Sequence, residues 1–145
     1  MSLRNAIAVL EDFSGAAARH FRDGALLEEN RRISNADQLF GFAAECAIKS
    51  ALVGLPGCTD SGALAQKYHE HIDKLWDLAQ VHGIQKRFRT LAVVLRDLRQ
   101  PFADWCTNQR YWPDRAVTEE TLRHHRDAAR RVIGSVGLSG TRREA

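Results

Sequence analysis

The stretch SNADQLFGFAAECAIKSALVGL, residues 34–55, decides the fold of this 145-residue chain. Its apolar residues surround nearly the whole circumference of a helix, as expected for a helix buried at the centre of a protein. Glu45 and Lys49 nevertheless lie one helical turn apart within it. Because a charge inside a protein needs a partner, these two side chains are expected to form an ion pair or to belong to a site.

The polar residues of this segment share one side of the predicted helix. With 3.6 residues per turn they fall within a stripe about 120° wide. Two interpretations of the stripe stay open: an ion pair at a solvent-facing seam, worth about 0.3 kcal/mol, or a polar groove between helices or protomers. At Gly41, in the middle of the stripe, the missing side chain would let a backbone or a ligand approach closely. The stripe consists of Ser34, Asp37, Gln38, Gly41, Glu45 and Lys49.

The other long segments also have helical periodicity, and none alternates with period two. Ser34 is predicted as the N-cap of the central helix, with Asp37 completing a capping-box variant. Ser61 and Thr118 are predicted caps of later helices, and PFADWCTNQRYWPD (101–114) is predicted to form one or two helical turns and then a loop. The predicted helices span residues 3–29, 34–55, 61–83, 84–100 and 118–137.

These segments predict an all-α fold, a single-domain up-down bundle of about five helices over residues 1–137. Residues 138–145 are predicted to be a disordered tail. The early acidic residues do not fit a secretory signal, and no apolar run approaches the roughly 18 residues of a membrane span. A cytoplasmic protein without membrane contact is therefore expected.

Cysteine and histidine spacings indicate no cofactor and no metal site. The three cysteines, Cys46, Cys58 and Cys106, form no CxxC pair, and no HExxH-like pair is present. The histidines are interpreted as core or surface residues. A carboxylate–histidine site assembled from Glu45, His69 and Asp73 stays open as an alternative.

Charge is distributed unevenly along the chain. Residues 1–83 carry 8 Lys/Arg against 11 Asp/Glu, and residues 84–145 carry 13 against 7, which gives the net charge of +3. Lys86, Arg89 and Arg96 fall on one side of the predicted fourth helix. Either a nucleic-acid surface or acidic and basic faces that meet in an oligomer would explain the asymmetry, and solvated helix faces are the plainer alternative.

Four segments together resemble the HEPN (higher eukaryotes and prokaryotes nucleotide-binding) domains over about residues 15–135. AAECAIKSAL after NADQLFGF looks like the second helix of that family, and YHEHIDKLWDLA is similar to its histidine-containing third helix. FADWCTNQRYWPD resembles the family's late aromatic-Arg-Tyr-Pro turn, and RHFRDGALLEENRR fits its first helix. The resemblance implies a compact, typically dimeric bundle, found beside minimal nucleotidyltransferases, in toxin–antitoxin pairs and in RNA-cleaving systems.

The ribonuclease members of that family carry Arg and His separated by four to six residues. Arg110 matches the arginine, but Arg115, Ala116 and Val117 occupy the positions where the histidine would fall. The chain is therefore expected to lack this ribonuclease activity.

The sequence thus predicts a non-catalytic, HEPN-like module that homodimerises and binds a partner protein, a nucleotide or RNA. The predicted groove beside the central helix is lined by Glu45, Lys49, His69 and Arg110, with Tyr111 able to stack on a base. The partner protein suggested by the resemblance is a nucleotidyltransferase. The alternatives are a divergent ribonuclease or hydrolase with a His/Glu site, and a purely structural helical oligomer.

Overall fold

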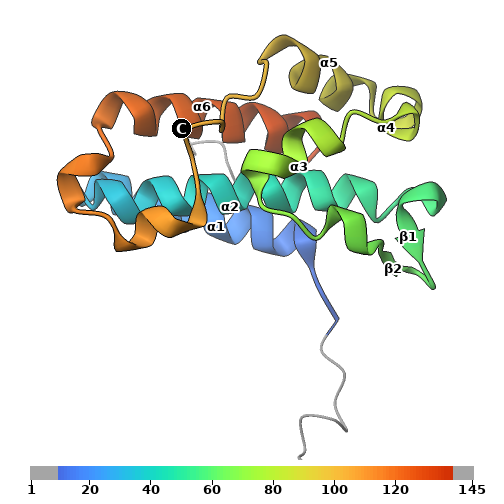
Figure 1. Cartoon of the computed structure of the whole chain (residues 1–145), viewed down its shortest axis with the longest axis horizontal. Helices are drawn as coiled ribbons and strands as arrows, with labels where there is room; N and C mark the ends of the chain where they lie inside the picture. Colours follow the sequence, from blue (N-terminus) through green and yellow to red (C-terminus); the bar gives the residue numbers. More distant parts are fainter. Residues whose placement is uncertain (1–9, 139–145) are drawn as a thin grey trace, which may run out of the picture.

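The computed structural model describes residues 10–138 and confirms an all-α bundle. Three long helices lie side by side in Figure 1: α1 (Phe13–Glu29), α2 (Ile33–Leu52) and α6 (Glu119–Ser135). The helix α2 lies between the other two, antiparallel to α1 and in the same direction as α6. The segment that is apolar nearly all round thus forms the central helix, as predicted, although the helix ends at Leu52 and not at residue 55.

Short elements connect α2 to α6. A hairpin of two short strands, β1 (Thr59–Asp60) and β2 (Ala63–Leu64), follows α2. Three short helices come next, and the indole N–H of Trp76 in the first donates to the carbonyl of Leu95 in the third at 3.0 Å. They are α3 (Ile72–Leu78), α4 (His82–Arg87) and α5 (Arg89–Asp97), and the remaining turns are the 3₁₀ helices η2 (Pro56–Cys58), η3 (Gln66–Tyr68), η4 (Thr107–Tyr111) and η5 (Asp114–Ala116).

The core of the bundle surrounds α2. Small side chains let α1 and α6 approach the α2 backbone closely, and large ones fill the spaces between these contacts. At Gly24 in α1, a Cβ atom would lie 3.0 Å from the Phe40 ring, so the glycine makes room for that ring and the helix continues through it. The buried residues of α2 include Ala36, Phe40, Ala43, Ala44, Ala47, Ile48, Ala51 and Leu52.

The predicted N-cap of the central helix is wrong. The helix begins at Ile33, and Ser34 lies inside its first turn, where the hydroxyl donates to the carbonyl of Asp114 at 3.0 Å. Asp37 makes no cap either, because its carboxylate is buried against α6 and η4. Both side chains form tertiary hydrogen bonds and therefore do not cap the helix.

The helix predicted over residues 61–83 is also wrong for much of its length. Ser61 and Gly62 both have positive φ, 52° and 81°, which matches a two-residue hairpin turn rather than a helix start. The chain forms α3 only from Ile72, and Gly83 lies within α4 instead of ending the preceding helix. Leu64 and Tyr68 are buried as the helical pattern required, although they belong to a strand and a 3₁₀ turn.

The predicted fourth helix is two helices, α4 and α5. Phe88 separates them with a non-helical backbone, φ −130° and ψ 62°. Positive φ at Arg99 and Gln100 then turns the chain before Pro101. The helical turns predicted within residues 101–114 appear as η4, and η5 begins at the end of that segment.

The last helix agrees with its prediction at its start. Thr118 is its N-cap, and its hydroxyl oxygen accepts from the backbone N–H of Thr121 at 3.1 Å. The helix α1 begins at Phe13, after Asp12, whose carboxylate accepts from the Gly15 N–H. Residues 10–12 precede this helix, although the prediction included them, and the predicted start at residue 3 and residues 139–145 of the predicted tail lie outside the described residues. Within residues 10–138, no helix is long and apolar enough to cross a bilayer.

Candidate functional site

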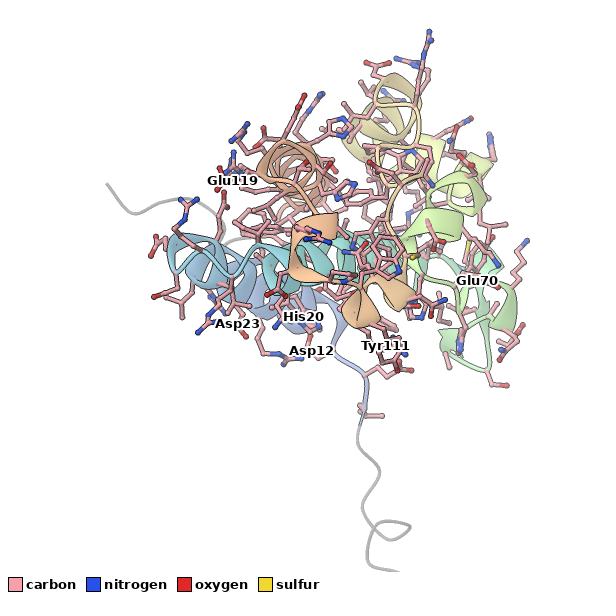
Figure 2. All side chains as sticks on the ribbon, turned by 60° about the vertical axis from the view of Figure 1, so that its left-hand side comes forward. Asp12, His20, Asp23, Glu70, Tyr111 and Glu119 are labelled. Atoms are coloured by element: carbon pink, nitrogen blue, oxygen red, sulfur yellow. The ribbon has the colours of Figure 1, made fainter. Side chains whose placement is uncertain are left out.

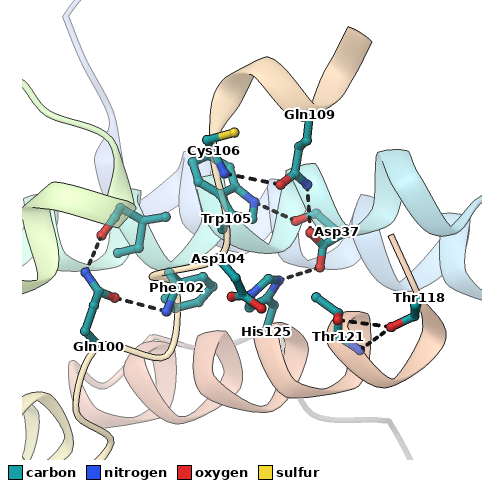
Figure 3. A network of polar contacts seen from close by, with 11 residues as sticks. Asp37, Gln100, Phe102, Asp104, Trp105, Cys106, Gln109, Thr118, Thr121 and His125 are labelled. Carbon is teal, nitrogen blue, oxygen red and sulfur yellow. Dashed lines mark hydrogen bonds and ion pairs between the residues drawn. The ribbon is translucent and has the colours of Figure 1, made fainter. Parts of the chain in front are cut away.

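A histidine held between two carboxylates joins α2 to α6 (Figure 3). The Nδ1 atom of His125 lies 2.7 Å from a carboxylate oxygen of Asp37, and its Nε2 atom lies 2.7 Å from one of Asp104. His125 and Asp37 are fully buried, whereas the Asp104 side chain is 61% exposed. The ring of His125 also stacks on Phe102, with centroids 5.2 Å apart.

This geometry favours a protonated imidazole. A neutral ring has one N–H and one lone pair, so one of its nitrogens would face a carboxylate without a proton to share. Burial by itself lowers the pKa of His125, but the hydrogen bonds and negative charges of Asp37 and Asp104 outweigh it and raise the pKa above its ordinary value of 6.5. With both nitrogens donating, His125 has no free position to act as a base, and we interpret it as structural.

The stability of the fold is therefore expected to decrease as the pH rises above 6.5. The unfolded chain releases the proton of this histidine near pH 6.5, while the folded protein retains it up to its higher pKa, so folding at a pH between the two takes up a proton. The free energy of unfolding should decrease by at most about 1.4 kcal/mol per pH unit in that window.

Urea unfolding between pH 6.5 and 8 measures this slope. His20 acts mainly below this range and with the opposite sign, because burial and the nearby Arg19 lower its pKa below 6.5. Cys46 contributes only at higher pH, because burial and then the charge of Glu45 raise its pKa to about 11. A free energy of unfolding that is constant or increases over this range would contradict the protonated His125.

The same network holds the segment 105–109 against α2. The Nε2 group of Gln109 donates to the second carboxylate oxygen of Asp37 at 2.7 Å, and the indole N–H of Trp105 donates to the backbone carbonyl of Asp37 at 3.1 Å. The Trp105 ring occupies the space over Gly41, where a Cβ atom would lie 2.1 Å from it. The close approach expected at Gly41 is thus made by an indole ring of the same chain.

Three consecutive residues at the end of η4 face solvent. Tyr111 is 76% exposed, Trp112 is 43% exposed, and Arg110 is exposed as well. The Arg110 guanidinium lies over the Tyr111 ring, 4.6 Å from its centroid, and donates to the carbonyl of Thr107 at 3.1 Å. Figure 2 shows Tyr111 projecting from the helical core at the edge of the molecule. We call Arg110, Tyr111 and Trp112 the aromatic tip.

The ion pair predicted on the central helix is present and is mostly buried. The Nζ atom of Lys49 lies 3.0 Å from one carboxylate oxygen of Glu45, with side-chain exposures of 12% and 10%. The other carboxylate oxygen lies 2.9 Å from Nδ1 of His71, which is half exposed. The solvent-facing seam is therefore excluded for this pair.

The polar stripe divides because its two edges face different neighbours. Asp37, at one edge, faces α6 and η4, whereas Glu45 and Lys49 face the loop before α3. Gln38 also belongs to the stripe and is only 7% exposed. Within residues 10–138, neither amide atom of Gln38 has a hydrogen-bond partner, which is rare for a buried side chain.

The five predicted binding residues do not join in one hydrogen-bonded cluster. Glu45 and Lys49 pair with each other, but His69 turns away, with Nε2 2.9 Å from the carbonyl of Leu64, and His71 takes the place expected for it beside Glu45. In the part of the chain that the structure describes, no hydrogen bond or ion pair connects Arg110 or Tyr111 to Glu45. The predicted site thus separates into a buried ion-pair cluster and an exposed aromatic tip.

The Asp37–His125 network was not predictable from the spacing of residues in the sequence. A histidine on the apolar face of the last helix indicated a core residue, and His125 is one. Its partners Asp37 and Asp104 are 88 and 21 residues away in the chain, so spacing could not connect them. Among the described residues, no group of three or more His, Cys, Asp or Glu side chains is arranged to hold a metal ion.

The chain matches no family model, no curated protein and no solved structure.

Proposed function

We propose that this chain is a non-catalytic helical interaction module of the HEPN type, which homodimerises through its aromatic tip. The observation that carries the proposal is the composition of the tip: an arginine, a tyrosine and a tryptophan, consecutive and exposed. These three residue types are the ones most enriched among the residues that contribute most to protein–protein binding energy.

The buried network supports this function because it fixes the tip in place. Gln109 precedes Arg110 and is tied to Asp37, while Trp105 packs over Gly41 at the other side of the segment. The stacking of Arg110 on Tyr111 holds the exposed ring further. A contact surface that is ordered before binding loses less conformational entropy when the partner arrives.

Light scattering of the wild-type protein at micromolar concentration is expected to report a dimer, and Trp112→Ser or Tyr111→Ser should weaken it. A central interface aromatic contributes about 2 kcal/mol or more, which corresponds to a roughly 30-fold increase in the dissociation constant. Both side chains are exposed, so the far-UV circular dichroism of a monomeric variant should match that of the wild type.

Leu78→Ser is the matched control, since it removes an exposed apolar side chain on α3, away from the tip. Its dimerisation should equal that of the wild type. A wild-type monomer, or equal weakening in the control and the tip variants, would refute dimerisation through the tip.

A nucleotide or RNA ligand beside α2 is the second candidate, favoured by Gln38. Its amide donor and acceptor have no hydrogen-bond partner among the described residues, and they match the edge of a base, which would reach them only by displacing the packing that buries them. Phosphate would then meet the cations of the ion-pair cluster around Glu45. Titration with nucleoside triphosphates and short RNA, using Gln38→Leu and Lys49→Ala, tests this candidate, and equal binding by both variants and the wild type would reject it.

A further inference from the structure

A basic groove with an apolar floor lies between α4 and α5, on a different part of the surface from the aromatic tip. It has a volume of about 520 Å³. Ile84, Ala92 and Val93 supply apolar lining, while Gln85, Arg89 and Arg96 supply polar groups. Figure 1 shows α4 and α5 at the periphery of the bundle, beside α3 and α6.

The outer face of α5 has the pattern of a helix that packs against another helix. Leu91, Val94 and Leu95 are buried toward the protein. The outward residues Arg89, Ala92, Val93 and Arg96 follow the spacing i, i+3, i+4, i+7, which places them in one stripe along the helix. Val93 is 41% exposed on this stripe, and the two arginines, about 10 Å apart along the axis, flank the apolar pair.

The charge of this region is strongly one-sided. Residues 79–99 contain five Lys or Arg residues and one acidic residue, Asp97. Arg96 contacts Asp97 at 3.1 Å on the surface, an exposed pair that costs little to separate. Arg89 has no ion-pair partner among the described residues.

We propose that this groove binds an acidic amphipathic helix of a partner protein. Such a helix would place apolar side chains on Ala92 and Val93 and carboxylates seven residues apart on Arg89 and Arg96. A nucleic acid fits less well, since it would leave the apolar floor uncovered, and the groove lining contains no aromatic ring on which a base could stack. The inference is independent of dimerisation through the tip.

The probe for a direct test is a fluorescein-labelled peptide, EQALLQAEQALLQAE, with glutamates seven apart and leucines between them. Its control is the same peptide with every glutamate replaced by glutamine. Fluorescence anisotropy with the full-length protein should show micromolar binding of the acidic peptide and at least tenfold weaker binding of the glutamine peptide. Added salt should weaken the first interaction, because the paired charges are exposed to screening.

Two variants of the groove test separately how its charges and its apolar floor contribute to peptide binding. The double variant Arg89→Gln/Arg96→Gln and the single variant Val93→Gln should each weaken binding of the acidic peptide at least tenfold. Arg123→Gln, which removes an exposed arginine on α6, is the control and should bind as the wild type does. Far-UV circular dichroism of each variant should match the wild type, because the altered side chains are exposed.

A short single-stranded RNA and a short duplex DNA, both labelled, form the third arm. Binding of RNA or DNA that is lost in Arg89→Gln/Arg96→Gln but unchanged in Val93→Gln, with no binding of the acidic peptide, would assign the groove to nucleic acid and overturn the proposal. Equal binding of the acidic and glutamine peptides, or no binding of either, would overturn it as well.

Discussion

Replacing Asp37 with leucine is expected to lower the free energy of unfolding by about 3–5 kcal/mol. The change leaves the buried imidazolium of His125 without its fully buried carboxylate, and removing one partner of a buried ion pair typically has a cost of this size. Gln109 also loses the acceptor of its amide donor. For a chain of this length the melting temperature should decrease by on the order of 10 °C.

Asp104→Ala is the matched control, because Asp104 contacts the other nitrogen of the same histidine at the same 2.7 Å distance. Its side chain is 61% exposed, so water can replace the lost carboxylate and the cost should stay below about 1 kcal/mol. Urea unfolding of the two variants at pH 6.5 measures the difference. Equal destabilisation by both substitutions would show that the burial of Asp37 does not set the strength of the contact.

The same comparison has a consequence for the aromatic tip. Gln109 connects Asp37 to the residue that precedes Arg110. If this connection orders the tip, as we propose, Asp37→Leu should weaken dimerisation even at temperatures where the variant is folded, whereas Asp104→Ala should not. The substitution would weaken dimerisation by changing the position of the aromatic tip, since Asp37 is fully buried and cannot itself contact a partner.

The fold was predictable where helical periodicity alone determines the structure. The helix α2 follows from a sequence that is apolar around most of its circumference, and the start of α6 follows from Thr118 and the acidic residues after it. The region from residue 56 to residue 100 was not predictable in the same way. There, apolar residues occur at helical spacing, but the chain forms a hairpin turn at Ser61–Gly62 and breaks the helix at Phe88. The backbone angles at these residues determine the secondary structure.

The candidate site was predictable in composition but not in arrangement. The pair Glu45–Lys49 is local, and a four-residue spacing fixes it wherever the helix lies. The partner of Glu45 on another element depends on which way the short segment before α3 turns. His69 and His71 are two residues apart, so a small change in backbone direction determines which of them reaches Glu45, and the structure selects His71.

Glu45→Leu is expected to cost about 3 kcal/mol of unfolding free energy. The Lys49 ammonium would stay in a largely buried position with its only carboxylate contact among the described residues removed. If the pair faced solvent, the same substitution would be almost neutral. Glu119→Leu supplies that comparison, because Glu119 pairs with Arg31 on the surface and should lose less than about 1 kcal/mol. Urea unfolding at neutral pH measures both variants, and equal losses would contradict the buried character of the Glu45 pair.

The double variant Glu45→Leu/Lys49→Met tests whether the ion pair binds a ligand, independently of its contribution to stability. Replacing both charges with apolar side chains of similar size is often neutral, so most of the stability lost in Glu45→Leu should return. His71 loses its contact with Glu45, but it is half exposed and water can hydrate it. A stable double variant that dimerises normally but fails to bind nucleotide or RNA would assign the cluster to ligand binding, because loss of folding could no longer explain the defect. A double variant that binds as the wild type does would make the cluster a purely structural feature of α2.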